Sequence, residues 1–243
     1  MVHTKEAVLM LDTPSESGES CVLGSTILRS QIVRIQFCSK MPLEVCQGEM
    51  WDVSAAHDRS ILAWAKKVFI SSKLLYELYI ASDTKIKLQN ARGLFWGYEN
   101  LCEINLDKWI DSSSVSDMSY MFCRCESLTS IDVSHFDTSH TESFARMFRD
   151  CAKVEILDVS HFQTQRVLHM ENMFYGCKCL KYLDLRGFDC SKAADLSYMF
   201  YGCQSLKNVL TAKRPSDRKH RAIMIELLAG CKKFAEEKKG MGI

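Results

Sequence analysis

The stretch MFYGCKCLKYLDLRGFD, residues 173–189, has two close copies in the chain. Residues 147–163 read MFRDCAKVEILDVSHFQ, and residues 199–215 read MFYGCQSLKNVLTAKRP. The Met-Phe pair recurs every 26 residues, at Met121–Phe122, Met147–Phe148, Met173–Phe174 and Met199–Phe200. A degenerate copy begins at Leu94–Phe95. An apolar skeleton at a fixed interval indicates stacked repeats, because a unit this short cannot bury its own apolar face.

Around each Met-Phe pair, apolar residues are spaced at i, i+3, i+4 and i+7. In the first full repeat these positions hold Met118, Met121, Phe122 and Cys125, and the following repeats keep the spacing. Residues at this spacing share one face of an α-helix. We therefore predict one short helix in each repeat, preceded by a capping residue such as Ser116.

Downstream of the pair, the apolar pattern changes to Leu-x-x-Leu-x-Leu-x-x-Phe. Leu180, Leu183, Leu185 and Phe188 show it most clearly. Alternation at the middle positions is typical of a short strand with one buried face. The sequence thus predicts an α/β fold, a leucine-rich-repeat-like solenoid with one short helix and one short parallel strand in each 26-residue repeat.

The segments outside the repeats suggest caps. We expect a flexible, polar lead-in over residues 1–24 and a β-rich N-terminal cap over residues 25–93. About five repeats then occupy residues 94–211, and a C-terminal capping helix is expected over residues 212–243. Such a helix would cover the last strand, whose open edge would otherwise invite aggregation.

Composition excludes several classes of function. The chain has 243 residues and a net charge of +1, so no overall field favours nucleic acid or anionic lipid. No apolar run approaches about 18 residues, so membrane insertion is not expected. Motifs of phosphate-binding loops, zinc proteases and serine hydrolases are missing, and we expect neither enzymatic activity nor a cofactor.

The repeats resemble a known family. DMSYMFCRCESLTSIDVSHFDTS (residues 117–139) and MENMFYGCKCLKYLDLRGFD (residues 170–189) look like the repeat of bacterial surface proteins of the BspA-like leucine-rich-repeat family. The resemblance covers about residues 27–209 and implies cell-surface display, adhesion and binding to another protein of the host or cell surface. The chain opens without a secretory signal pattern and shows no wall-anchor motif after the last repeat, so a cytoplasmic location is the alternative.

The best functional lead is a column of aspartates on the predicted strands. Asp132, Asp158 and Asp184 lie between inward-facing residues and should point outward, about 5 Å apart. Like charges at that distance repel by about 1 kcal/mol in water, so a cationic partner would be favoured. With their neighbours they form the predicted partner-binding strip: Glu103, Asn105, Asp107, Ser130, Asp132, Ser134, Ile156, Asp158, Ser160, Tyr182, Asp184 and Arg186. A solvated acidic face without a partner is the competing interpretation.

Other clusters favour structural roles. Cys125, Cys151, Cys177 and Cys203 recur every 26 residues on the apolar face, which favours core packing over a metal or redox array. The paired His135 and His161 suggest a weaker metal hypothesis. The prediction is therefore a non-enzymatic, monomeric protein-binding module, with a structural or self-assembly element as the alternative.

Overall fold

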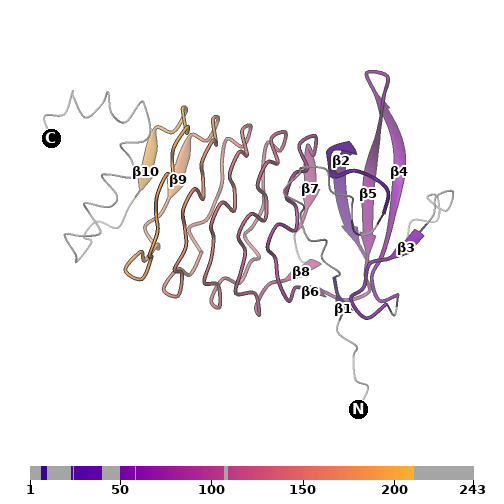
Figure 1. Cartoon of the computed structure of the whole chain (residues 1–243), viewed down its shortest axis with the longest axis horizontal. Helices are drawn as coiled ribbons and strands as arrows, with labels where there is room; N and C mark the ends of the chain where they lie inside the picture. Colours follow the sequence, from indigo (N-terminus) through magenta and orange to yellow (C-terminus); the bar gives the residue numbers. More distant parts are fainter. Residues whose placement is uncertain are drawn as a thin grey trace, which may run out of the picture.

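The computed structural model describes residues 7–9, 23, 25–39, 50–57, 59–106 and 109–210 (Figure 1). Most of the predicted lead-in and the whole of the predicted capping helix lie outside these residues. Strand β1 (Ala7–Val8) pairs in parallel with β6 (Ile86–Lys87), which pairs in parallel with β8 (Ile110–Asp111). This small sheet joins three distant parts of the chain.

A five-stranded mixed sheet lies before the repeats, in the order β3–β4–β5–β2–β7. Its strands are β2 (Ile32–Cys38), β3 (Met50–Asp52), β4 (Leu62–Ile70), β5 (Lys73–Ala81) and β7 (Glu103–Asn105). Neighbours β3, β4 and β5 are antiparallel, whereas β5, β2 and β7 are parallel. In β2, Ile35 and Phe37 are buried in alternation, and Ile32, three residues before Ile35, is also buried because the pairing with β5 shifts register between Ile32 and Arg34.

One buried arginine ties this sheet to the first repeat. Arg29, in the single described 3-10 helix η1 (Arg29–Gln31), donates hydrogen bonds to the carbonyls of Gly93 and Trp96 at 3.1 and 2.8 Å. Its guanidinium also lies 5.3 Å from the ring centre of Tyr98. Because β7 belongs to the degenerate repeat and pairs with β2, the sheet and the repeats share a continuous core.

Residues 94–210, here called the repeat stack, form successive rungs beside the five-stranded sheet (Figure 1). Their phenylalanines make one column, with ring centres 5.3, 5.7, 5.8 and 5.7 Å apart in the order Phe95, Phe122, Phe148, Phe174 and Phe200. Such spacing is typical of stacked aromatic rings. The positions predicted to face inward in the first repeat, Met118, Met121, Phe122 and Cys125, are fully buried.

The predicted fold class is nevertheless wrong. The described residues contain no α-helix, and the chain there is strand, turn and single bridges, so an α/β solenoid with one helix per repeat does not form. Within residues 112–210, extended strands are confined to β9 (Tyr182–Asp184) and β10 (Asn208–Leu210), which pair in parallel. The intervening repeats are joined there by single bridges such as Ser130 with Ile156.

Backbone hydrogen bonds show what replaces the predicted helix. The amides of Tyr120, Phe122 and Arg124 donate to carbonyls of the next repeat, those of Ala145, Met147 and Arg149, at 2.9, 2.8 and 2.7 Å. Amides between them close turns: Cys123 donates to the carbonyl three residues earlier at 3.0 Å. Alternate amides therefore point along the stack, which an α-helix does not allow.

Left-handed residues make this pattern possible. Tyr120 and Arg124 have φ of 60° and 62°, and equivalent residues of later repeats are also positive. An α-helix needs negative φ at every position, so a left-handed residue at every fourth position breaks it into consecutive turns. Two such turns place apolar residues on one side at the same spacing as a helix does. The apolar spacing alone therefore predicts a helix where the chain forms consecutive turns.

A column of buried hydroxyls also crosslinks the repeats. The hydroxyls of Ser112, Thr138 and Thr164 accept the backbone N–H of Asp137, Gln163 and Asp189 at 2.9, 2.8 and 2.6 Å. All three side chains are buried. Satisfying a buried amide in the next repeat stabilises the stack, because an unpaired buried amide costs about 1–3 kcal/mol.

Gly176 should be among the least replaceable residues of the stack. Its φ is +72°, and a Cβ there would overlap Oδ1 of Asp150 in the preceding repeat. We expect Gly176→Ala to lower the free energy of unfolding by about 2–3 kcal/mol, combining a left-handed penalty of about 1–2 kcal/mol with the displacement of Asp150. Urea denaturation would measure the loss.

Gly97→Ala is the matched control, since Gly97 holds the equivalent position with φ of +78° and nothing within 4 Å of an added Cβ. It should show the conformational penalty alone, about 1–2 kcal/mol. Equal losses in the two variants would contradict close packing between the turns.

Candidate functional site

Part of the predicted partner-binding strip does form a continuous surface. Ser130, Ile156 and Tyr182 are joined by parallel bridges, and Tyr182 pairs with Asn208 in the next repeat. Ile156 is 68% exposed and Tyr182 39% exposed, unusual values for large apolar side chains. We call this row of residues 130, 156, 182 and 208 the strand face.

The aspartate column has a local structural role that the sequence reasoning missed. Asp132, Asp158 and Asp184 each accept the backbone N–H two residues later, from Ser134, Ser160 and Arg186, at 2.9, 2.9 and 3.1 Å. The Ser160 hydroxyl also donates to Asp158, and the Arg186 guanidinium forms a fork with Asp184. These are Asx turns, so each carboxylate is already engaged by its own chain.

The same turn recurs throughout the stack. Carboxylates of Asp111, Asp117, Asp137, Asp189 and Asp195 accept the N–H of a serine two residues later, at 2.8–3.0 Å. Hydrogen bonds to the charged form hold the pKa of Asp132, Asp158 and Asp195 below the ordinary value, with Ser134, Ser160 and Ser197 as donors. The recurring Asp-x-Ser motif was the sequence signal for this role.

The first residues of the predicted strip serve the junction with the N-terminal sheet. Glu103 forms an ion pair with Arg34 at 3.0 Å. The side-chain oxygen of Asn105 accepts the N–H of Phe37 at 2.7 Å, and its amide donates to the Phe37 carbonyl at 3.3 Å. Asp107 lies outside the described residues.

The cysteine column is built into the core. Thiols of Cys125, Cys151, Cys177 and Cys203 donate to the carbonyls of Phe95, Phe122, Phe148 and Phe174 at 3.0, 3.2, 3.1 and 3.0 Å. Burial raises the pKa of Cys125, Cys151 and Cys177 well above the ordinary value. These three thiols therefore stay protonated, and each of the four satisfies a carbonyl of the preceding repeat.

One histidine of the predicted pair is engaged by the backbone of the preceding repeat. Nε2 of His161 lies 2.9 Å from the carbonyl of Val133, so that nitrogen carries the proton and donates. Across the described part of the chain, no group of three or more histidine, cysteine, aspartate or glutamate side chains is arranged to hold a metal ion.

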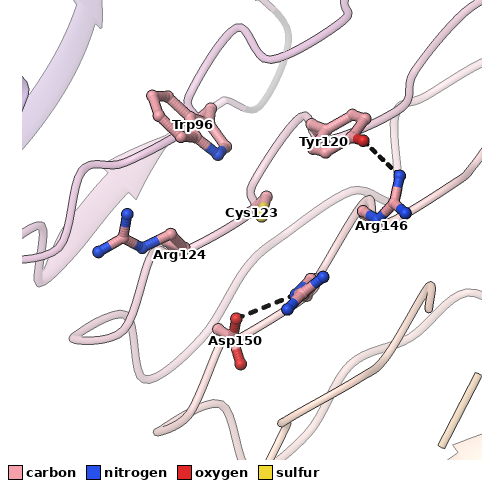
Figure 2. Close-up of a pocket in the computed structure, with 7 residues that line it drawn as sticks. Trp96, Tyr120, Cys123, Arg124, Arg146 and Asp150 are labelled. Carbon is pink, nitrogen blue, oxygen red and sulfur yellow. Dashed lines mark hydrogen bonds and ion pairs between the residues drawn. The ribbon is translucent and has the colours of Figure 1, made fainter. Parts of the chain in front are cut away.

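The structure also forms an open hollow that the sequence analysis did not predict. It has a volume of about 500 Å³ and spans the turns of successive repeats (Figure 2). Its lining consists of Trp96, Tyr120, Cys123, Arg124, Arg146, Arg149 and Asp150. In Figure 2, Cys123 lies in the middle, with Trp96 and Arg124 on one side of it and Tyr120 and Arg146 on the other. We call it the arginine–aromatic hollow.

Aromatic rings contact two of the three arginines of this hollow, Arg146 and Arg149. The Arg146 guanidinium lies 5.1 Å from the ring centre of Tyr120 and donates to its hydroxyl, while Arg92 lies 4.9 Å from the same ring. Arg149 lies 4.6 Å from the ring centre of Tyr175. Contacts of this kind attract a cation to the face of the ring and fix its orientation.

The charges of the hollow are only partly balanced. Arg124 pairs with Glu99 at 2.5 Å and Arg149 with Asp150 at 3.2 Å, whereas no carboxylate of the described residues lies within ion-pair distance of Arg146. Three arginines and one aspartate line the hollow, which therefore favours an anionic or aromatic group. Burial raises the pKa of Cys123 to about 12, so its thiol is not a nucleophile at neutral pH.

The hollow escaped the sequence analysis because its residues do not repeat. Trp96, Cys123 and Arg149 hold equivalent positions in three successive repeats, yet they share no chemistry. The available signal was an arginine or aromatic residue within three positions of several Met-Phe pairs. Only stacking of the repeats brings these residues together.

Asp158→Ala should test the Asx turns. It removes the acceptor of two hydrogen bonds to Ser160, and we expect it to lower the free energy of unfolding by about 1 kcal/mol, less if solvent screening dominates. Asp158→Asn keeps an acceptor oxygen and should cost less in urea denaturation at pH 7. If both variants match the wild type, the turns do not depend on this side chain.

Acid should weaken the fold through the same groups. Because the folded-state pKa values of Asp132, Asp158 and Asp195 are lowered, their contribution is present above the ordinary aspartate pKa of about 4 and is lost as pH falls through and below it. Thermal denaturation between pH 7 and pH 3 should show a smaller acid-induced decrease for Asp158→Asn than for the wild type. An identical decrease would argue against linkage at Asp158.

Thiol accessibility should separate the cysteines into two groups. Exposed Cys102 should react within minutes with a thiol-specific disulfide reagent, whereas Cys125, Cys151, Cys177 and Cys203 should react only after unfolding. Mass spectrometry of labelled peptides would identify each site. Rapid native labelling of any column cysteine would contradict its place in the core.

Comparisons with known proteins give a family without a function. A search of curated proteins and a search of solved structures found no match. Residues 85–237, more than half of the chain, match the family described as "Mycoplasma protein of unknown function, DUF285". The match includes every Met-Phe repeat, and the chain belongs to this family.

Proposed function

We propose that the chain is a non-enzymatic protein-binding module that engages its partner through the strand face. The observation that carries this proposal is the exposure of Ile156 and Tyr182 in consecutive, bridged repeats. Large apolar side chains gain most when a partner covers them, and burying one contributes about 1.5–3 kcal/mol. Stacked repeats often use such surfaces for extended recognition.

The surroundings of the strand face support a stable interface. Glu155 and Lys181, which flank Ile156 and Tyr182 in sequence, form an ion pair at 2.5 Å between adjacent repeats. Beneath the surface, Leu157 and Leu183 are buried. A partner would therefore meet side chains on a fixed backbone, which reduces the entropy lost on binding.

The chemistry of the stack supports a role other than catalysis. The buried column thiols donate to backbone carbonyls, and Asp132 and Asp158 of the predicted strip are engaged in turns. The arginine–aromatic hollow combines tryptophan, tyrosine and arginine, the residue types that most often dominate protein interfaces. Both surfaces are thus suited to binding.

The resemblance to BspA-like repeats supports a finer version of this proposal. In that version the chain is displayed at a cell surface and adheres to a protein of a host or neighbouring cell. The matched family is related and repeat-containing, and its description assigns no activity. Location and partner identity both belong to the proposal.

Self-assembly is the second candidate function. Within the described residues, β10 is paired on one side only, by β9, and a strand edge can pair with another copy. Light scattering over a hundredfold range of protein concentration separates the candidates. A molecular mass that rises with concentration would favour assembly, whereas a constant monomer mass would favour binding to another protein.

The strand-face variant Ile156→Ser/Tyr182→Ser should lose its partner. Proteins captured by wild-type and variant chains would be compared by quantitative mass spectrometry, and any candidate would be purified for titration. We expect affinity to fall by about tenfold or more, while the urea midpoint stays close to that of the wild type.

Tyr198→Ser is the control, because Tyr198 is 64% exposed at a left-handed turn position outside the strand face. It should retain the partner. If every captured protein binds all three chains equally, the strand face is not the binding surface.

A further inference from the structure

The β4–β5 hairpin extends beyond the sheet that contains it. Strand β3 pairs with β4 only over Leu62–Trp64, and β2 pairs with β5 only from Tyr76 onward. Residues 65–75 therefore form a two-stranded ribbon, with no third strand beside it among the residues that the structure describes. Figure 1 shows the closed end of this hairpin projecting past the neighbouring strands.

The end of the ribbon is apolar and exposed. Phe69 is 74% exposed, Ile70 50% and Leu74 36%. Phe69 faces Leu74 across the two strands, whereas Ile70 is opposite Lys73 and its side chain points to the other face. Ser71 and Ser72, with φ of 51° and 64°, make the tight turn between them. Apolar groups thus cover both faces of the tip.

Cations surround this apolar tip. Lys66, Lys67 and Lys73 lie within residues 65–76, a segment that contains no aspartate or glutamate. All three lysines are exposed. The ammonium group of Lys66 lies 3.8 Å from the carboxylate of Glu77, which is on the side of the ribbon toward the body of the sheet. The ribbon and its tip therefore combine three lysines, one of them ion-paired with Glu77, with three exposed apolar side chains, in a chain of net charge +1.

We propose that this hairpin tip is a membrane-surface binding element, which inserts Phe69, Ile70 and Leu74 between lipid headgroups of an anionic bilayer. The lysines would lie at the level of the phosphates, where anionic lipid attracts cations, while the apolar side chains leave water. Across the described residues, no helix has the length and apolarity to span a membrane. The proposed contact is thus peripheral.

The shape of the tip favours a bilayer over a groove in a protein. A bilayer surrounds an inserted ribbon, so it can cover Phe69 and Leu74 on one face and Ile70 on the other. A groove that accepted only one face would leave the other in water. The three lysines supply the complementarity that selects anionic over zwitterionic lipid.

Vesicle co-sedimentation of the full chain tests the proposal. Vesicles of phosphatidylcholine with 30% phosphatidylglycerol would be compared with phosphatidylcholine alone, at about 0.1 M and 0.5 M salt. We expect binding to the anionic vesicles to be about tenfold or more stronger, and to weaken at high salt. Absence of binding to anionic vesicles, or equal binding to both lipids, would overturn the proposal.

Two variants assign the binding to the tip. Phe69→Ser/Ile70→Ser should lose most vesicle binding without lowering the urea midpoint, because both side chains are already exposed and lie beyond the sheet. Lys67→Ser/Lys73→Ser should lose the preference for anionic lipid. Binding that survives the first variant would place the contact elsewhere and overturn the proposal.

The outcome is separable from that of the proposed function. Ile156→Ser/Tyr182→Ser should bind anionic vesicles as the wild type does, because the strand face is not part of the hairpin. The opposite outcome is that the wild-type chain binds neither type of vesicle and the Phe69→Ser/Ile70→Ser variant no longer binds a purified protein partner. In that case the tip binds protein, and the lipid proposal fails.

Discussion

The repeat stack depends on one constraint: alternate backbone amides of each turn segment must reach carbonyls of the next repeat. The amides of Tyr120, Phe122 and Arg124 do so at 2.7–2.9 Å, and later repeats continue the ladder. An insertion within a turn segment would move the amides that follow it away from their carbonyls, leaving buried polar groups unpaired. One extra residue outside the ladder is tolerated: Phe95 and Phe122 are 27 residues apart, yet the amides of Phe95 and Gly97 still donate to the carbonyls of Met121 and Cys123 at 2.8 and 2.9 Å. From Phe122 onward the phenylalanine column keeps a period of 26 residues, which the cysteine and hydroxyl columns share.

The sequence was sufficient to predict which side chains are buried, but not the backbone that buries them. Phe122 and its equivalents fall in one stacked column because burial requires a shared interior, and periodicity reports burial directly. A helix and a pair of consecutive turns place apolar residues at the same spacing. They differ in the sign of φ at every fourth residue, which is positive in the turns. Glycine at positions 97, 176 and 202 hinted at left-handed residues, but Arg124 and Asp150 adopt the same conformation and concealed the pattern.

The candidate site shows a similar division. Ile156 and Tyr182 of the predicted strip are exposed, as alternation with the buried Leu157 and Leu183 requires. The sequence prediction of a ligand-binding role for the aspartates rests on their charge alone. In the structure, the carboxylates of Asp132 and Asp158 accept hydrogen bonds from backbone amides two residues later. The arginine–aromatic hollow could not be predicted, since its shape depends on how Trp96, Tyr120 and Arg146 are offset in neighbouring rungs. Spacing along a chain does not specify that offset.

The ladder also explains where this architecture leaves room for function. Inward positions are fixed: the thiol column is cysteine in four successive repeats, because each S–H must reach a phenylalanine carbonyl. The turn position after each column phenylalanine instead holds Trp96, Cys123, Arg149, Tyr175 and Tyr201 in successive repeats. A residue there changes the surface without disturbing the backbone pairing, whose donors and acceptors are main-chain atoms. The hairpin tip has fewer constraints still, because neither β2 nor β3 pairs with residues 65–75. Binding specificity can therefore change at the turns and the tip while the ladder stays intact.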